Sequence, residues 1–385
     1  MNPVPEPLAL ARTLIAAESV TPAGPAVFDK VEAALAAAGF AVERMHFDAK
    51  GSGPVENLFA TLARGNEGRH LALAGHVDVV PSGPAEKWTH PPFAAAVDGD
   101  TLFGRGAQDM KGAVAAMIVA AARWSADGSV PGRISFLITG DEEGPAINGT
   151  RPLVAWAAER YPIDATIVGE PTSRQVLGDT IKIGRRGSMS AEITVIGKQG
   201  HVAYQEAADN PIPALLAIGQ ALKEPLDEGS AHFAPSNLEI VSIDVGNPAF
   251  NVIPAQAQLR FNVRANDHWT VDRLKDELAS RVAHAAPATE FHIDWKPGES
   301  EAFLTRDDDL VERVVSAVEG VTGVRPEATT GGGTSDARFI KNHSPVIEFG
   351  AVGSTMHQID ERTSVAELET LTAAYEAIIE RVLAP

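Results

Sequence analysis

Cysteine is absent from the 385 residues of this sequence. Disulfide bonds, thiol nucleophiles and zinc sites with cysteine ligands are therefore excluded, so any metal ion must be held by His, Asp and Glu side chains. The sequence also has no apolar run long enough to span a bilayer and no basic leader followed by an apolar segment. These absences predict a globular, soluble protein of the cytoplasm with no membrane partner.

Positive charge is scarce as well. With 32 Lys and Arg against 51 Asp and Glu, the formal net charge at pH 7 is −19. Nucleic acid is therefore not expected as a partner, and neither is an anionic membrane surface, because phosphate groups are bound by basic faces. A small anionic substrate remains compatible with this charge, since a few local arginines outweigh the global field at short range.

The first 180 residues alternate between helical patterns and short apolar runs rich in β-branched residues. Helices are expected at residues 8–17, 27–38 and 110–126, and strands at 57–62, 71–74, 133–139 and 164–168. This alternation predicts an α/β sheet. Apolar residues make up 44% of the sequence, which at this length is enough for a substantial core and two domains.

The pattern changes between about residues 181 and 295. Strand and helix signals follow one another there in the order β-α-β-β-α-β, which is typical of a ferredoxin-like split βαβ unit. Asn210 and Thr270 are expected to cap the two helices of this unit. The segment therefore reads as a second domain.

Helix and strand alternation resumes after residue 295. The last helix is expected to open with a capping box formed by Ser364 and Glu367. The predicted organisation is one domain built from residues 1–180 and 296–385, with the domain of residues 181–295 inserted in it.

Acidic and histidine side chains follow the ends of three predicted strands. His76 and Asp78 follow LALAG, Glu142 and Glu143 follow ISFLITG, and Glu170 follows ATIVG. Ligands of α/β sheets gather beyond the carboxyl ends of the strands. Because residues two apart on an extended chain point to the same side, the Asp78 carboxylate is expected to reach one nitrogen of His76 and leave the other for a metal. Taken one at a time, these residues have ordinary alternatives: His76 could be a structural histidine hydrogen-bonded to a nearby acid, and the glutamates could be solvated surface residues.

Two further residues extend this set. Asp109 lies before an Ala-rich helix, where a carboxylate is also a common capping device. His357 follows the strand VIEFG, where a lone histidine also serves structural purposes. Two His and three or four carboxylates, with no Cys, suit a pair of zinc-like ions about 3.5–4 Å apart.

Six blocks of the sequence together resemble the M20 metallopeptidase family. They are, in order, GHVDVVP, GRGAQDMKGA, TGDEEGPAINGT, VGEPT, GKQGHVAYQ and GGGTSDARF. The resemblance spans nearly the whole chain. It implies a zinc-peptidase-like catalytic domain with an inserted ferredoxin-like lid and dimerisation domain, a homodimer, and two Zn²⁺ per subunit for which Co²⁺ is a candidate substitute.

The same resemblance implies how the metal ligands are divided. His76 and Glu170 would hold one zinc ion, Glu143 and His357 the other, and Asp109 would bridge both.

The resemblance also assigns roles beside the metals. Asp78 would orient His76, and Glu142 would be the general base that takes a proton from water and passes it to the leaving amine. His201 would reach the partner subunit's site and stabilise the developing oxyanion; a structural loop residue is the alternative. The implied substrate contacts are Arg186, Tyr204, Asn251, Arg264, Gly333, Thr334 and Ser335. Ion pairing is the alternative for the arginines, and a plain turn for the glycine-rich segment.

The implied reaction is hydrolysis of N-succinyl-LL-2,6-diaminopimelate to succinate and LL-2,6-diaminopimelate, a step towards lysine and cell-wall precursors. The block GGGTSDARF favours this substrate over the alternative, another N-acyl amino acid such as N-acetylornithine. A catalytically inactive dimeric scaffold is a third reading, against which the intact ligand set argues. The chain departs from the family pattern at Gln205, Ala337 and Gly353, none of which is an expected metal ligand.

Overall fold

The computed structural model describes residues 6–49, 52–65, 67–127 and 130–385, and within them the chain divides into two units. The first unit consists of the described residues within Met1–Gly184, Leu304–Thr329 and Ser335–Pro385, and the second of Arg185–Phe303 and Thr330–Thr334. None of the helices in the described part of the chain has the length and apolar character needed to cross a membrane.

The first unit is built on an eight-stranded mixed sheet with the order β1-β2-β6-β3-β7-β18-β8-β17. The bounds of these strands are β1 Ala41–Phe47, β2 Val55–Arg64, β3 His70–His76, β6 Gly132–Thr139, β7 Ala165–Val168, β8 Thr180–Lys182, β17 Glu327–Thr329 and β18 Val346–Glu348. In its centre β3 runs parallel to both β6 and β7, and β7 runs parallel to β18. These strands are buried on both faces, which explains why they read as continuous apolar runs.

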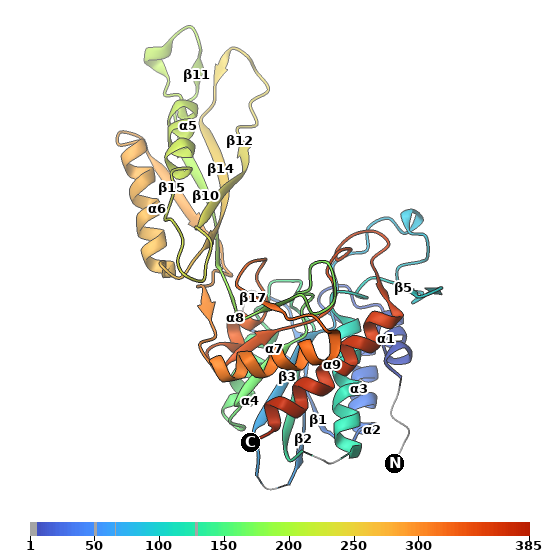
Figure 1. The fold of residues 1–385 in the computed structure, drawn as a ribbon. Coiled ribbons are helices and arrows are strands. Elements are labelled where there is room, and N and C mark those ends of the chain that lie inside the picture. Colours follow the sequence, from blue (N-terminus) through green and yellow to red (C-terminus); the bar gives the residue numbers. More distant parts are fainter. Residues whose placement is uncertain (1–5, 50–51, 66, 128–129) are drawn as a thin grey trace. The chain divides into compact units, whose positions relative to one another are not determined.

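Helices cover this sheet and close the main core. They are α1 Pro7–Ala16, α2 Pro25–Ala37, α3 Lys111–Asp127, α4 Thr150–Ala158, α7 Asp308–Thr322, α8 Ala337–Ile340 and α9 Val365–Leu383. The nearly all-round burial of α3 follows from its position within the core cluster, where it lies beside α9 although the two are far apart in the sequence (Figure 1). The three helices predicted in the first 180 residues are confirmed, with ends displaced by at most two residues. β1 and α4 lie outside the predicted elements.

The remaining strands of the first unit and its borders are short. They are β4 Val97–Asp98, β5 Thr101–Phe103, β9 Gly184–Arg185, β16 Phe303–Leu304 and β19 Arg362–Ser364. β19, β5 and β4 form a small antiparallel sheet.

The predicted capping box at the start of α9 is half correct. The hydroxyl of Ser364 accepts a hydrogen bond from the main-chain N–H of Glu367 at 3.1 Å. The carboxylate of Glu367 accepts instead from the N–H of Val352 at 2.9 Å, so it holds the strand-to-loop segment after β18 rather than closing the box.

The second unit contains a four-stranded antiparallel sheet with the order β12-β14-β10-β15. Its elements follow the chain as β10 Gly187–Ile196, β11 Gly200–His201, α5 Pro211–Leu222, β12 Asn237–Asp244, β13 Val252–Ile253, β14 Gln256–Ala265, α6 Val271–Ala285 and β15 Phe291–Trp295. Burial alternates along β10, and its inward residues pack against both helices in a separate core. Asn210 and Thr270 cap α5 and α6 as predicted, accepting from the N–H groups of Ile212 and Arg273.

Candidate metal centre

The carboxyl ends of the central strands lie at one edge of the first unit's sheet. His76 ends β3 and is in register with Thr139 at the end of β6, while Ala74 is in register with Val168 at the end of β7. His76 ends β3, and Glu143 and Glu170 follow the ends of β6 and β7, so these three side chains start from neighbouring positions.

Two groups of metal-binding side chains occur at this edge. One contains His76, Asp109 and Glu170, and the other contains Asp109, Glu143 and His357. Within each group the ligand atoms all lie within 4.8 Å of one another. The structure thus brings together all five side chains proposed as ligands, and Asp109 belongs to both groups.

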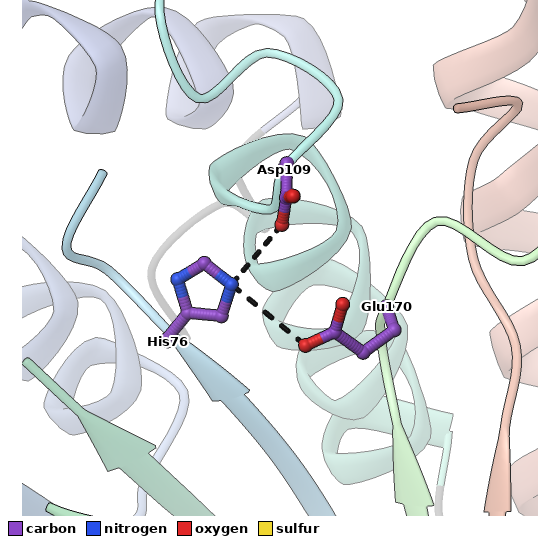
Figure 2. A group of neighbouring side chains, drawn as sticks. All are labelled: His76, Asp109 and Glu170. Carbon is purple, nitrogen blue, oxygen red and sulfur yellow. Dashed lines mark hydrogen bonds and ion pairs between the residues drawn. The ribbon is translucent and has the colours of Figure 1, made fainter. Parts of the chain in front are cut away.

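The first group is buried. The Nε2 atom of His76 lies 3.1 Å from Oδ1 of Asp109 and 3.8 Å from Oε1 of Glu170, as Figure 2 shows. The other ring nitrogen, Nδ1, donates to the main-chain carbonyl of Asp78 at 2.9 Å. This bond fixes the ring so that Nε2 faces the two carboxylates.

The carboxylate of Asp78 comes within ion-pair distance of His76 but does not form a hydrogen bond with it. It lies 3.6 Å from Nδ1 of His76 and accepts instead from the main-chain N–H groups of Glu142 and Glu143, at 3.2 and 3.0 Å. The reason is that the two main-chain N–H groups of the turn after β6 hold the carboxylate, while Nδ1 of His76 donates to the Asp78 carbonyl. Asp78 therefore orients the imidazole through its carbonyl and holds the turn after β6 through its carboxylate.

The second group is more exposed. Nε2 of His357 lies 2.9 Å from Oε1 of Glu143 and 3.1 Å from Oδ2 of Asp109, and the His357 side chain is 48% exposed. His357 adopts a left-handed conformation with φ of 63°. Since Oδ1 of Asp109 faces His76 and Oδ2 faces His357, the two oxygens of one carboxylate serve the two groups.

The carboxylates of the two groups favour positive charge on the histidines that they surround. Burial would lower the pKa of His76, but the hydrogen bond to Asp109 and the surrounding carboxylates raise it well above its usual value. Hydrogen bonds to Asp109 and Glu143 raise the pKa of His357 to about 10. Burial alone would raise the pKa of Asp109, whereas both histidines together lower it.

A divalent cation would supply the same charge in each group. One imidazole nitrogen and two carboxylate oxygens per group, with one carboxylate shared, are a donor set that zinc accepts. The residues present therefore fit a pair of metal ions.

Glu142 lies beside the ligands but belongs to neither group. Burial, followed by the charges of Glu170 and Asp336, raises the pKa of Glu142 well above its usual value. A carboxyl group with a raised pKa next to a ligand cluster has the properties of a proton carrier. Asp336 is itself buried and was not among the predicted site residues, although the block GGGTSDARF contains it.

The other predicted contacts belong mainly to the second unit. His201 is exposed on β11, and its Nδ1 accepts from the N–H of Ala203 at 3.1 Å. Arg186 donates to Oδ1 of Asn237 at 2.8 Å. Arg264 lies on β14, and Tyr204 and Asn251 are exposed. None of the predicted contacts in this unit belongs to either metal-binding group.

The glycine-rich segment is engaged within the protein at two positions. The carbonyl of Gly333 accepts from Arg185 at 3.0 Å. Ser335 is fully buried, and its hydroxyl donates to Glu348 at 2.6 Å; the substrate contact predicted for it involves its main-chain N–H. Thr334 lies between them.

Fold and site together define an α/β protein with a two-part cluster of metal ligands, joined by one carboxylate, at the edge of its central sheet. The family model described as "Peptidase family M20/M25/M40" matches residues 72–381. The chain belongs to this family.

Two curated relatives match the whole chain. One, from Methylobacterium sp. (strain 4-46), is 52% identical over 387 aligned residues, which cover 99% of this chain and 97% of the relative. The other, from Rhodopseudomonas palustris (strain TIE-1), is 50% identical over 389 aligned residues and is covered completely, as is this chain. Both are named succinyl-diaminopimelate desuccinylase.

Solved structures share the fold. An M20 family metallo-carboxypeptidase from Sulfolobus solfataricus aligns with a TM-score of 0.79 at 16% identity, covering 98% of this chain and 99% of that protein. At this level of identity the likeness concerns the fold.

Proposed function

We propose that this chain is a metal-dependent amidohydrolase that cleaves N-succinyl-LL-2,6-diaminopimelate into succinate and LL-2,6-diaminopimelate, a step towards lysine and cell-wall precursors in the cytoplasm. The observation that carries the proposal is the full-length identity of about half of all residues to two proteins with that activity in their names. The two ligand groups that share Asp109 supply the chemistry that an amide hydrolase of this kind needs.

The proposed cofactor is a pair of Zn²⁺ ions per subunit, with Co²⁺ as a substitute. His76 and Glu170 would hold one ion, Glu143 and His357 the other, and Asp109 both. When bound, such a pair lowers the pKa of water towards about 7 and polarises the amide carbonyl.

Glu142 is the proposed proton carrier. Its side chain lies among the carboxylates of the site without being needed as a ligand, so it is free to accept a proton from water and deliver it to the leaving amine. Asp78 holds the main chain of Glu142 and Glu143 and thereby sets the direction in which each side chain leaves the turn.

Two copies of the chain are proposed to associate through the second unit, acting as an inserted ferredoxin-like lid and dimerisation domain of about residues 181–295. β12 is an edge strand of the sheet, and it carries Val241 and Ile243, which are 66% and 52% exposed. Leu216 on α5 is 58% exposed. An edge strand with exposed apolar side chains is normally covered, and a second copy would cover it symmetrically.

In such a homodimer the exposed His201 is available to the partner's site, where it would stabilise the oxyanion. The carboxylates of the anionic substrate would be bound by the arginines and polar groups predicted from the sequence, namely Arg186, Tyr204, Asn251, Arg264, Gly333, Thr334 and Ser335, the last through its main chain.

The decisive assay measures hydrolysis of succinyl-diaminopimelate and N-acetylornithine side by side with the zinc-loaded protein. The proposal expects a much higher kcat/KM for the succinylated substrate. Equal rates, or a preference for N-acetylornithine, would place the chain among other N-acyl amino acid deacylases of the family.

A further inference from the structure

We propose that Glu361, four residues after His357, is a positioning residue that sets Asp109 for both metal-ligand groups. The inference rests on the proposed function in one respect, namely that these groups hold metal ions. Glu361 itself belongs to neither group.

The Glu361 carboxylate lies against the loop that carries Asp109. The residue is fully buried. Its Oε1 atom accepts from three main-chain N–H groups of one loop, those of Gly106 at 3.1 Å, Gln108 at 3.0 Å and Asp109 at 3.2 Å. The carboxylate thus holds the main chain of the bridging ligand itself.

Arg105 supplies the counter-charge to the Glu361 carboxylate. Oε2 of Glu361 accepts from Nη1 of Arg105 at 2.7 Å, and Arg105 is only 2% exposed. The other terminal nitrogen of Arg105 donates to the carbonyls of Pro81 and His357, at 3.4 Å each. The guanidinium also lies over the Trp88 ring, 5.3 Å from its centroid. One buried ion pair therefore links the segment after His76, the loop that carries Asp109 and the main chain of His357.

A reciprocal contact joins the same segments. The side-chain oxygen of Gln108 accepts from the N–H and the hydroxyl of Thr355, at 2.8 and 2.9 Å. The Thr355 hydroxyl also accepts from the N–H of Arg362 at 3.1 Å. The loop of Asp109 and the segment of His357 are thus joined by two sets of hydrogen bonds, one through Glu361 and one through Gln108.

These contacts explain the geometry of the bridge. Asp109 serves two histidines only because its two oxygens point to different sides. A neutral side chain at position 361 would leave Arg105 buried without its charge partner and would weaken the hold on three N–H groups. The orientation of the Asp109 carboxylate would then become variable, and the ligand atoms of both groups would no longer be held at fixed distances from one another. Mutation of a residue that hydrogen-bonds to a metal-binding residue typically lowers metal affinity by about 10–100-fold.

The test compares Glu361→Gln and Glu361→Asp with Glu56→Gln as a matched control. Glu56 is also a buried glutamate paired with an arginine, Arg44, but its side chain makes no contact with the ligand loops among the contacts described for it. Zinc affinity of the metal-free proteins is measured by competition with a chromophoric chelator, and unfolding by calorimetry. Glu361→Gln is expected to bind zinc about 10–100-fold more weakly, while Glu56→Gln keeps wild-type affinity despite a loss of thermal stability.

Each outcome decides the matter. Wild-type zinc affinity in Glu361→Gln, together with a drop in Tm like that of Glu56→Gln, would show that Glu361 is only structural. If Glu361→Gln does not fold, the zinc affinity of Glu361→Asp decides between the two roles. Aspartate keeps the negative charge but is too short to contact both the loop of Asp109 and Arg105. Wild-type zinc affinity in Glu361→Asp would therefore overturn the inference. A wild-type chain that binds no zinc would overturn the proposed function and this inference together, whereas failure of the inference alone leaves the wild-type zinc content intact.

Discussion

The adjacent acids Glu142 and Glu143 allow the division of labour in the site to be tested with two isosteric changes. Oε1 of Glu143 lies 2.9 Å from Nε2 of His357 within a ligand group, whereas Glu142 belongs to neither group. Glu142→Gln should therefore remove proton transfer and leave both metals bound. Glu143→Gln should remove a ligand from one metal and leave the other.

The expected size follows from what each variant retains. Both keep their main-chain hydrogen bonds to Asp78, at 3.2 and 3.0 Å, so the turn should stay in place. A positioned general base contributes about 10²–10⁴-fold, and Glu142→Gln should lose a factor in this range from kcat. Because burial and neighbouring carboxylates disfavour the charged form of Glu142, as its raised pKa shows, the neutral amide should not lower the Tm of the metal-free protein.

The assay combines zinc content per chain after dialysis, by plasma mass spectrometry, with kcat and KM for the succinylated substrate. Glu142→Gln is expected to keep two zinc ions per chain and to have a low kcat, whereas Glu143→Gln is expected to lose about one ion. Near-normal turnover of Glu142→Gln, or loss of its zinc, would show that the two roles are wrongly assigned.

Three further predictions concern metal, subunits and pH. Chelation should abolish activity and zinc should restore it, as measured by hydrolysis before and after dialysis; full activity of the metal-free protein would contradict a metal site. An equimolar mixture of the His201→Ala and Glu142→Gln proteins should, after free subunit exchange, have about a quarter of its sites active if His201 acts across the dimer, because about half of the dimers are mixed and each mixed dimer has one intact site. Activity that stays at the mutants' background despite exchange shown by mass would exclude that arrangement. Asp227 is buried enough for desolvation to raise its pKa, but hydrogen bonds from Ser236 and Trp269 outweigh this and lower the pKa to about 2. Its contribution to stability is therefore present above the unfolded-state pKa of 3.8 and is lost as the pH falls through about 2. In chemical denaturation, the stability difference between wild type and Asp227→Asn should accordingly shrink over that interval; a difference independent of pH would show that the charge of Asp227 does not matter.

Much of the scaffold could be predicted because its signals are local. Three helices and the strands that end near His76, Glu143 and Glu170 follow from periodicity and from turn residues, and the caps at Asn210 and Thr270 follow from residue type at the helix start. A strand's end and a cap depend on a few consecutive residues, which is why the sequence alone suffices for them.

The contacts between segments that are far apart in the chain are harder to predict from the sequence. Placing Asp109 between His76 and His357 depended on the resemblance to a known family, since periodicity says nothing about which loops meet. In the structure the two oxygens of Asp109 face histidines that are 33 residues before it and 248 after it in the chain numbering.

Only the tertiary structure decided how those ligands are held. It showed that Nδ1 of His76 donates to the main-chain carbonyl of Asp78, whereas the Asp78 carboxylate lies 3.6 Å from the same nitrogen. It also brought out Glu361, whose sequence neighbourhood offers no sign of a role and whose partners at Arg105 and Asp109 lie more than 250 residues away along the chain. A sequence pattern records which residues can form a strand, a cap or a ligand, but the direction of a buried hydrogen bond depends on where the rest of the chain places its donors and acceptors.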